Sequence, residues 1–123
     1  NTIQHFNFVR DVRKFIINSD CIVLPSYREG TSKSLLEAAS MGRPIIATDV
    51  PGCNNIVKNN YNGFLCKPRD VKSLEMALIN MIELHYSKRE KMSINGRKMV
   101  ISKYGVKVVN KKILEILGFE WWV

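Results

Sequence analysis

The sequence predicts an α/β domain in which helices flank a parallel sheet. Two short apolar runs, 21–24 and 45–47, are rich in β-branched residues and bounded by turn residues, as buried strands are. Between them, residues 34–41 are good helix formers, and Gly42 and Pro44 end that helix. Strand, loop, helix and strand in this order predict a βαβ crossover, the unit of a parallel sheet.

Further elements are predicted on both sides of this crossover. Before it, residues 2–6 alternate like a short strand, and 9–18 has the apolar spacing of an amphipathic helix. After it, the loop 48–55 leads towards another strand at 64–66. The remaining segments are predicted to be helices: 70–84 with Asp70 as its N-cap, 88–102, and 106–117 after Gly105.

Composition predicts one domain with a real core. The chain has 123 residues, of which 46% are hydrophobic, and no apolar run approaches the roughly 20 residues of a membrane span. Cys21, Cys53 and Cys66 lack the spacing of paired metal ligands, so they are expected to be reduced core residues of a cytosolic protein. The sequence also lacks an Asp-x-Asp pair, and His5 and His85 are far from any cysteine pair, so neither a metal site nor a cofactor is expected.

The chain is basic, with a formal net charge of +8. Nine of the nineteen Lys and Arg residues fall between Ser87 and Lys112. A basic face suits an enzyme that works beside anionic lipid and binds pyrophosphates, and a solvated surface is the alternative. Nucleic acid is not an expected partner, because no nucleic-acid module is recognisable and the aromatic residues do not interleave with the basic ones.

The loop after the first strand of the crossover carries the candidate chemistry. Gly30, Thr31 and Ser32 place a flexible residue and two hydroxyls where the helix starts, and unpaired N–H groups there favour a phosphate. Glu29 precedes this loop and Glu37 lies one turn into the helix, and carboxylates accept hydrogen bonds from vicinal hydroxyls. The arrangement predicts a nucleotide-sugar site. The alternative is that Ser32 is only an N-cap and both carboxylates are solvated.

The same stretch resembles the nucleotide-sugar-binding half of a family 4 glycosyltransferase. The signature of that family is two glutamates with seven residues between them, which Glu29 and Glu37 match. The resemblance covers residues 5–105, with matches in the family's order. The matching segments are Ser19–Gly30, Glu37-Ala38, Gly42-Arg-Pro44, Ile-Ala-Thr-Asp49, Pro51-Gly52, Asn62-Gly-Phe-Leu65 and Pro68-Arg-Asp70.

The resemblance implies the GT-B architecture, in which two Rossmann-like domains face each other across a cleft. Residues 1–123 are then a single, incomplete carboxyl-terminal domain, and the family's donor-diphosphate Arg and Lys are expected upstream. The acceptor-binding amino-terminal domain is missing from this chain. The terminal helix and aromatic tail, 105–123, are expected to pack on that partner domain.

The resemblance also implies a reaction. It is transfer of a sugar, with retention, from a UDP-hexose or UDP-N-acetylhexosamine. Glu29 is the expected catalytic residue in contact with the hexose, and Glu37 the expected acceptor of the ribose hydroxyls. The full set of expected donor-binding residues is Gly30, Thr31, Ser32, Lys33, Ser34 and Glu37.

The sequence of residues 24–34 most resembles that of bacterial transferases that build capsule, O-antigen or glycoprotein glycans on a polyprenyl-diphosphate lipid. A cytoplasmic enzyme at the inner face of the membrane, with peripheral membrane contact, is therefore expected. A GT-B-type epimerase and a non-catalytic nucleotide-sugar-binding lobe remain alternatives, although the paired glutamates favour the transferase. One departure is that Cys53-Asn54-Asn55 replaces a Gly-Gly and a later Glu, so Asn55 is expected to cap a short helix instead.

Overall fold

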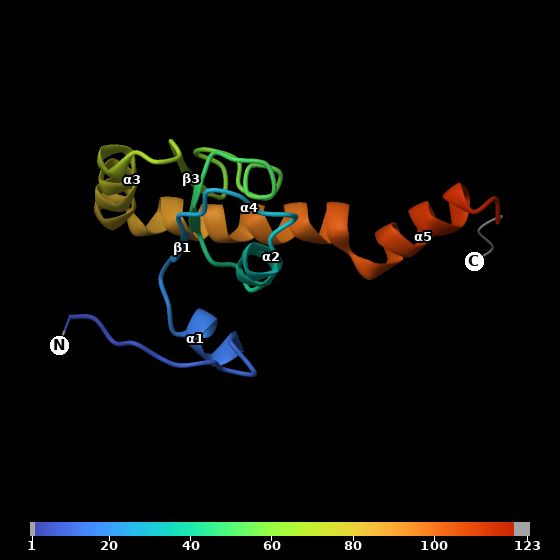
Figure 1. Cartoon of the computed structure of the whole chain (residues 1–123), viewed down its shortest axis with the longest axis horizontal. Helices are drawn as coiled ribbons and strands as arrows, with labels where there is room; N and C mark the ends of the chain where they lie inside the picture. Colours follow the sequence, from blue (N-terminus) through green and yellow to red (C-terminus); the bar gives the residue numbers. More distant parts are fainter. Residues whose placement is uncertain (1, 120–123) are drawn as a thin grey trace.

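The computed structural model describes residues 2–119, which form a small parallel sheet surrounded by helices (Figure 1). The strands are β1 (Ile22–Leu24), β2 (Ile45–Thr48) and β3 (Gly63–Cys66). The helices are α1 (Arg13–Ile17), α2 (Lys33–Ser40), α3 (Val71–Glu83), α4 (Tyr86–Tyr104) and α5 (Val106–Ile116). None of these helices is both long enough and apolar enough to span a lipid bilayer.

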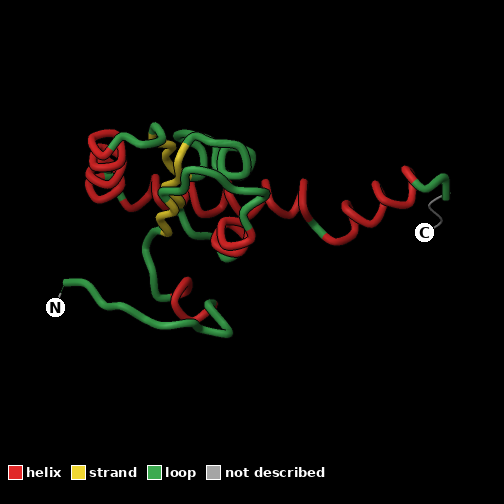
Figure 2. The backbone as a smooth tube through the Cα atoms, in the orientation of Figure 1, coloured by secondary structure: helices red, strands yellow, loops and turns green. Residues whose placement is uncertain are grey.

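The three strands are parallel and lie in the order β1-β2-β3. Helix α2 makes the crossover from β1 to β2, so the predicted βαβ unit and the α/β fold class are confirmed. The register pairs Leu24 with Ala47 and Thr48 with Cys66, so that all three strands end at the same edge. All four residues of β2 are buried, as expected for the central strand. Figure 2 shows the strands enclosed by helices and loops.

Helices cover both faces of the sheet, and α4 contributes to both. On one face Ile45 and Ala47 contact Leu35 of α2 and Val100 of α4. On the other face Ile46 and Phe64 contact α3 and the amino-terminal half of α4. Successive residues of a strand point to opposite faces, which explains why β2 divides its side chains between two cores.

The predicted strand at 2–6 is wrong, because residues 2–9 have no regular structure. A strand needs a hydrogen-bonding neighbour, and this segment pairs with no described strand. Its apolar side chains remain in solvent, with Ile3 85% and Phe8 94% exposed. The helix expected at 9–18 is shorter and forms only α1. The side chain of Arg43, which follows α2, donates to the last two carbonyl groups of α1 and so attaches α1 to the domain.

Beyond the sheet the predicted helices form with small shifts. Asp70 is the N-cap of α3, as expected, and accepts from the Ser73 N–H at 2.9 Å. Helix α4 begins at Tyr86, where the His85 ring accepts from the Ser87 N–H. The short helix expected after Asn55 is absent, since residues 51–56 form turns, and the prediction that Asn55 caps it is wrong.

Helix α5 extends away from the body of the domain (Figure 1). None of its residues is buried. Val106, Val109, Ile113 and Ile116 give it an exposed apolar stripe at helical spacing. The first aromatic residue of the tail at 118–123 is Phe119, which is 63% exposed, and the prediction for the remaining residues, 120–123, lies outside the described residues.

Candidate functional site

The candidate site lies at the edge where the three parallel strands end. The loops 25–32, 49–62 and 67–70 leave the strands there, and α2 begins there. Ligands of open α/β sheets bind at this edge. The structure brings all the predicted site residues together in the first of these loops and in α2: Glu29, Gly30, Thr31, Ser32, Lys33, Ser34 and Glu37.

Ser32 is the N-cap of α2, and its polar groups are already used within the protein. Its Oγ accepts from the Leu35 N–H at 3.4 Å, and its own N–H donates to the Gly52 carbonyl at 3.2 Å. Its side chain is buried, at 4% exposed. The N–H groups of Lys33 and Ser34, in contrast, donate to no described residue. These two N–H groups, together with the positive end of the helix dipole, are therefore free to bind an anion.

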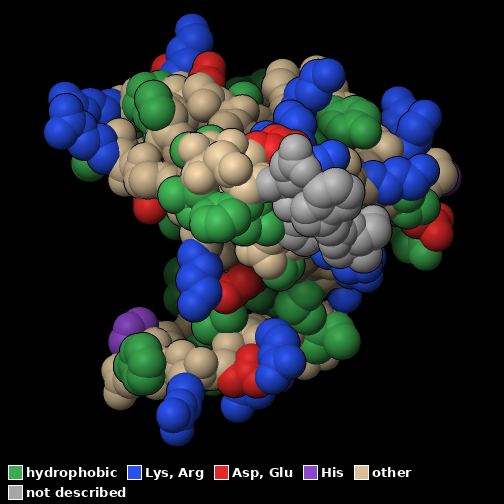
Figure 3. Space-filling model, turned by 90° about the vertical axis from the view of Figure 1, so that its right-hand side faces the viewer, with side chains coloured by type: hydrophobic (Ala, Val, Ile, Leu, Met, Phe, Trp, Pro, Cys, Tyr) green, Lys and Arg blue, Asp and Glu red, His purple; other side chains and the backbone are tan. Residues whose placement is uncertain are grey.

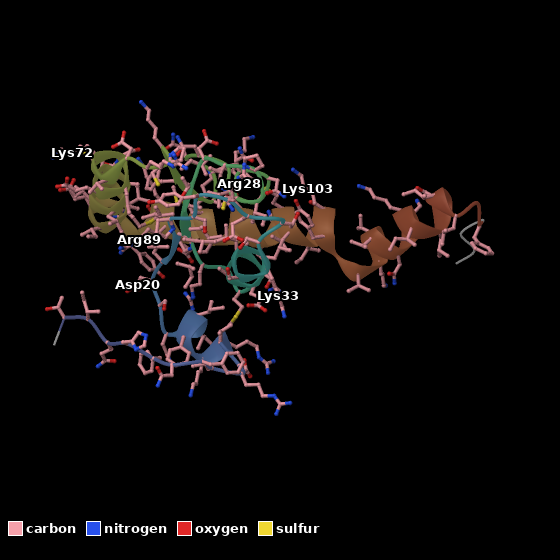
Figure 4. All side chains as sticks on the ribbon, in the orientation of Figure 1. Asp20, Arg28, Lys33, Lys72, Arg89 and Lys103 are labelled. Carbon is pink, nitrogen blue, oxygen red and sulfur yellow. The ribbon has the colours of Figure 1, made fainter. Side chains whose placement is uncertain are left out.

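The two glutamates of the signature lie in different surroundings. Glu29 is exposed, and its Oε1 accepts from the Ser26 hydroxyl at 2.7 Å. The Glu37 side chain is 37% exposed, and its carboxylate is 3.9 Å from the ammonium group of Lys33. The Lys33 side chain is 90% exposed and extends outward from α2 (Figure 4). Both carboxylates thus keep oxygen lone pairs for hydroxyl groups of a ligand.

Gly52 holds the loop that contains Glu29 and Gly30. Its φ is +90°, a conformation that residues with a side chain rarely adopt. A Cβ atom at this position would be 2.0 Å from the Gly30 carbonyl oxygen and 2.3 Å from that of Glu29. Only a glycine permits this approach, so the loops after β1 and β2 form one unit. The sequence alone did not identify this contact, although Pro51-Gly52 is part of the matched pattern.

Asn55 provides a second link between these loops that was not predicted. Its Nδ2 lies 3.4 Å from Thr31 Oγ1 and 3.2 Å from Tyr104 Oη. Tyr104 is 49 residues further along the chain, at the end of α4. No pattern of local spacing in a sequence reports a contact over this distance.

A cavity of about 410 Å³ opens at the same edge, between the loops after β1 and β3. At its rim the Arg69 guanidinium lies 5.4 Å from the centre of the Tyr27 ring, a cation–π contact. Thr48 and Cys66, the last residues of β2 and β3, are also among the residues that line it. Burial raises the pKa of the Cys66 thiol, so this group is protonated at neutral pH.

Residues 2–119 contain no group of three His, Cys, Asp or Glu side chains placed to hold a metal ion. The three cysteines are free thiols, with Cys53 and Cys66 buried and Cys21 partly buried.

Basic side chains are scattered over the face drawn in Figure 3 and alternate with hydrophobic ones, without one continuous patch. The basic side chains on this face therefore favour neither a surface for anionic lipid and pyrophosphates nor a merely solvated surface.

Residues 1–99 match the family model described as glycosyl transferases group 1. A Campylobacter jejuni N,N'-diacetylbacillosaminyl-diphospho-undecaprenol alpha-1,3-N-acetylgalactosaminyltransferase is 36% identical over 73 residues, which are 59% of this chain and 19% of the relative. The capsular polysaccharide biosynthesis glycosyltransferase CapM of Staphylococcus aureus is 32% identical over 101 residues, covering 82% of this chain and 26% of the relative.

The solved structure of Anabaena Alr3699/HepE in complex with UDP-glucose superposes with a TM-score of 0.78 at 26% identity. That superposition covers 90% of this chain and 30% of the HepE chain. The chain thus spans only about a fifth to a quarter of the length of the two curated relatives (19% and 26%). The predicted resemblance is confirmed: the chain belongs to the glycosyl transferases group 1 family, whose members have the GT-B fold.

Proposed function

We propose that this chain is the donor-binding domain of a retaining glycosyltransferase that uses a UDP-hexose or UDP-N-acetylhexosamine to build bacterial cell-surface glycans. The observation that carries the proposal is the unbonded pair of N–H groups at Lys33 and Ser34, flanked by Glu29 and Glu37. Anion donors between two hydroxyl-accepting carboxylates fit a nucleotide-sugar. The UDP-glucose bound by HepE supports this class of donor.

In this proposal each residue of the loop has its own role. The N–H groups of Lys33 and Ser34 bind the donor diphosphate, while Ser32 fixes the start of the helix. Gly30 and Thr31 line the path of the donor, and the Lys33 side chain stays in solvent. Glu37 accepts hydrogen bonds from the ribose hydroxyls. Glu29 contacts the hexose and stabilises the positive charge that develops at its anomeric carbon in the transition state.

The acceptor side of the reaction is proposed to come from a second domain. The exposed stripe of α5 is a surface that an amino-terminal acceptor domain would cover, and residues 105–123 are the segment expected to reach it. The C. jejuni relative is named for a diphospho-undecaprenol acceptor, which supports a polyprenyl-linked acceptor here. With such an acceptor, the enzyme is proposed to work at the cytoplasmic face of a membrane.

Calorimetric titration of residues 1–123 with UDP and with uridine tests the phosphate role. UDP is expected to bind more tightly, because only UDP carries the anion that the start of α2 favours. Equal affinity for the two ligands would remove this role from the loop.

Two substitutions then test the different roles proposed for Glu29 and Glu37. A charge-assisted hydrogen bond contributes about 1.5–3 kcal/mol, so Glu37→Ala is expected to weaken UDP binding about tenfold or more. Glu29→Ala is expected to keep UDP affinity and to lower kcat in the complete enzyme, because its interaction strengthens in the transition state. Glu83→Ala, at the exposed end of α3, is the matched control. Loss of UDP affinity in Glu29→Ala, or normal UDP affinity in Glu37→Ala, would contradict these roles.

A further inference from the structure

A chain of hydrogen bonds connects the candidate donor loop with the end of α4. The Asn55 side-chain amide donates to Thr31 Oγ1 at 3.4 Å and to Tyr104 Oη at 3.2 Å. The Tyr104 hydroxyl donates in return to the Asn55 carbonyl oxygen at 3.5 Å. Three segments that are distant in the sequence therefore meet at one amide group.

This arrangement determines how the Thr31 hydroxyl is oriented. Because Thr31 Oγ1 accepts from Asn55, its own proton remains available, and it donates to no described residue. Thr31 is exposed and directly precedes Ser32, the N-cap of α2. An O–H donor then stands beside the unbonded N–H groups of Lys33 and Ser34, which suits the oxygens of a diphosphate.

Tyr104 also lies at the junction between the domain body and α5. It is the last residue of α4, and Gly105, with φ −58° and ψ 141°, breaks the helix before α5 begins. Helix α5 buries no residue, so its direction depends on this junction. A displacement of α5 is therefore transmitted first to Gly105 and its neighbour Tyr104.

We propose that Tyr104 is a positioning residue for the donor site. It holds the Asn55 amide, and through it the Thr31 hydroxyl, in the orientation that donates to the donor diphosphate. It also couples that orientation to the placement of α5. The proposal rests on the proposed function, since it assigns the diphosphate to the same loop. Tyr104 contacts Asn55 and not the donor, so its effect is indirect.

A double-mutant cycle in residues 1–123 tests the proposal. Tyr104→Phe, Asn55→Ala and the double variant are compared in UDP affinity, in hydrogen exchange of the Ser32 amide, and in unfolding midpoint. Tyr86→Phe is the matched control, because Tyr86 is exposed on the same helix and its hydroxyl bonds to no described residue. We expect Tyr104→Phe to speed exchange of the Ser32 amide, which donates to the Gly52 carbonyl oxygen, and to weaken UDP binding, each about 2- to 10-fold. Tyr86→Phe should change neither.

The cycle also distinguishes positioning from packing. If Tyr104 acts through the Asn55 side chain, most of the effect of Tyr104→Phe on UDP affinity and on exchange at Ser32 disappears in the Asn55→Ala background, where only the bond from the Tyr104 hydroxyl to the residue-55 carbonyl oxygen remains to be lost. Additive effects, or an acceleration of exchange in β2 and α3 equal to that at Ser32, would overturn the proposal. Faster exchange in the loop with unchanged UDP affinity would also overturn it. If the wild-type chain does not bind UDP, the loop alone does not hold the diphosphate, whereas the coupling between Tyr104 and the loop is still decided by hydrogen exchange.

Discussion

The substitution Gly52→Ala probes whether the loops after β1 and β2 are one unit. The new methyl group would lie 2.0 Å from the Gly30 carbonyl oxygen, an overlap that only a shift of the backbone relieves. Residues with a side chain pay about 1–2 kcal/mol for a left-handed backbone. Separating the loops also breaks the bond from the Ser32 N–H to the Gly52 carbonyl, at about 0.5–1.5 kcal/mol.

Together these contributions predict a loss of about 1.5–3.5 kcal/mol in the free energy of unfolding. For a domain of this size that corresponds to a decrease of about 5–20 °C in Tm. Circular dichroism melting and urea titration measure both quantities, and UDP titration shows whether the loop has moved. UDP affinity is expected to fall, because Gly30, Thr31 and Ser32 are displaced together.

Gly30→Ala is the matched control in the opposing loop. A Cβ atom at Gly30 has no neighbour within 4 Å, and the φ of this residue is not positive. Its substitution is expected to change stability by no more than about 0.5 kcal/mol. If Gly52→Ala melts within about 2 °C of the wild type and binds UDP normally, the two loops are not held by this contact and the reasoning is refuted.

Two further predictions concern the core. Leu35→Ala should lower the free energy of unfolding by about 2–5 kcal/mol, measured by urea titration, because Leu35 is fully buried between α2 and the sheet; a loss under about 1 kcal/mol would contradict this packing. Burial raises the pKa of Cys21 to about 11, so its alkylation by iodoacetamide at pH 8.5, followed by mass spectrometry, should be about 100-fold slower than that of a free thiol. Because the folded pKa lies above the unfolded one, the stability that the Cys21 thiol contributes is complete below about pH 8.5 and is lost as the pH rises towards 11. A native alkylation midpoint near pH 8.5 would contradict the shift.

The sequence was informative wherever structure depends on neighbours along the chain. The crossover from β1 through α2 to β2 follows from apolar runs and turn residues, and the Asp70 cap follows from local chemistry. The strand at 2–6 was wrong because alternation says nothing about whether a neighbouring strand exists. The Asn55 cap was wrong because this side chain bonds instead to Tyr104, which no local pattern brings near.

In the candidate site, too, some features follow from neighbours along the chain and others depend on tertiary contacts. The glutamates and the start of α2 were recognisable as a motif, and the structure groups them as expected, while their roles remain predictions. The N–H of Ser32 is different, since its engagement by Gly52 depends on a loop 20 residues further along the chain. Tertiary contacts therefore decide which N–H groups at the start of α2 remain without a hydrogen-bond partner, and a sequence motif does not show this.

Helix α4 contributes to both cores, with Met92 on one face of the sheet and Val100 on the other. Its Gly96 lies between them, where a Cβ atom would come 3.2 Å from Asn62. During synthesis, neither face of the sheet is closed until this helix has been made. At about 5–20 residues per second, the 38 residues from Lys67 to Tyr104 take about 2–8 seconds to add after the last strand. For that interval the three strands are finished but their apolar faces are covered only in part, by α2 and later by α3, so the nascent domain is expected to be most prone to aggregation then.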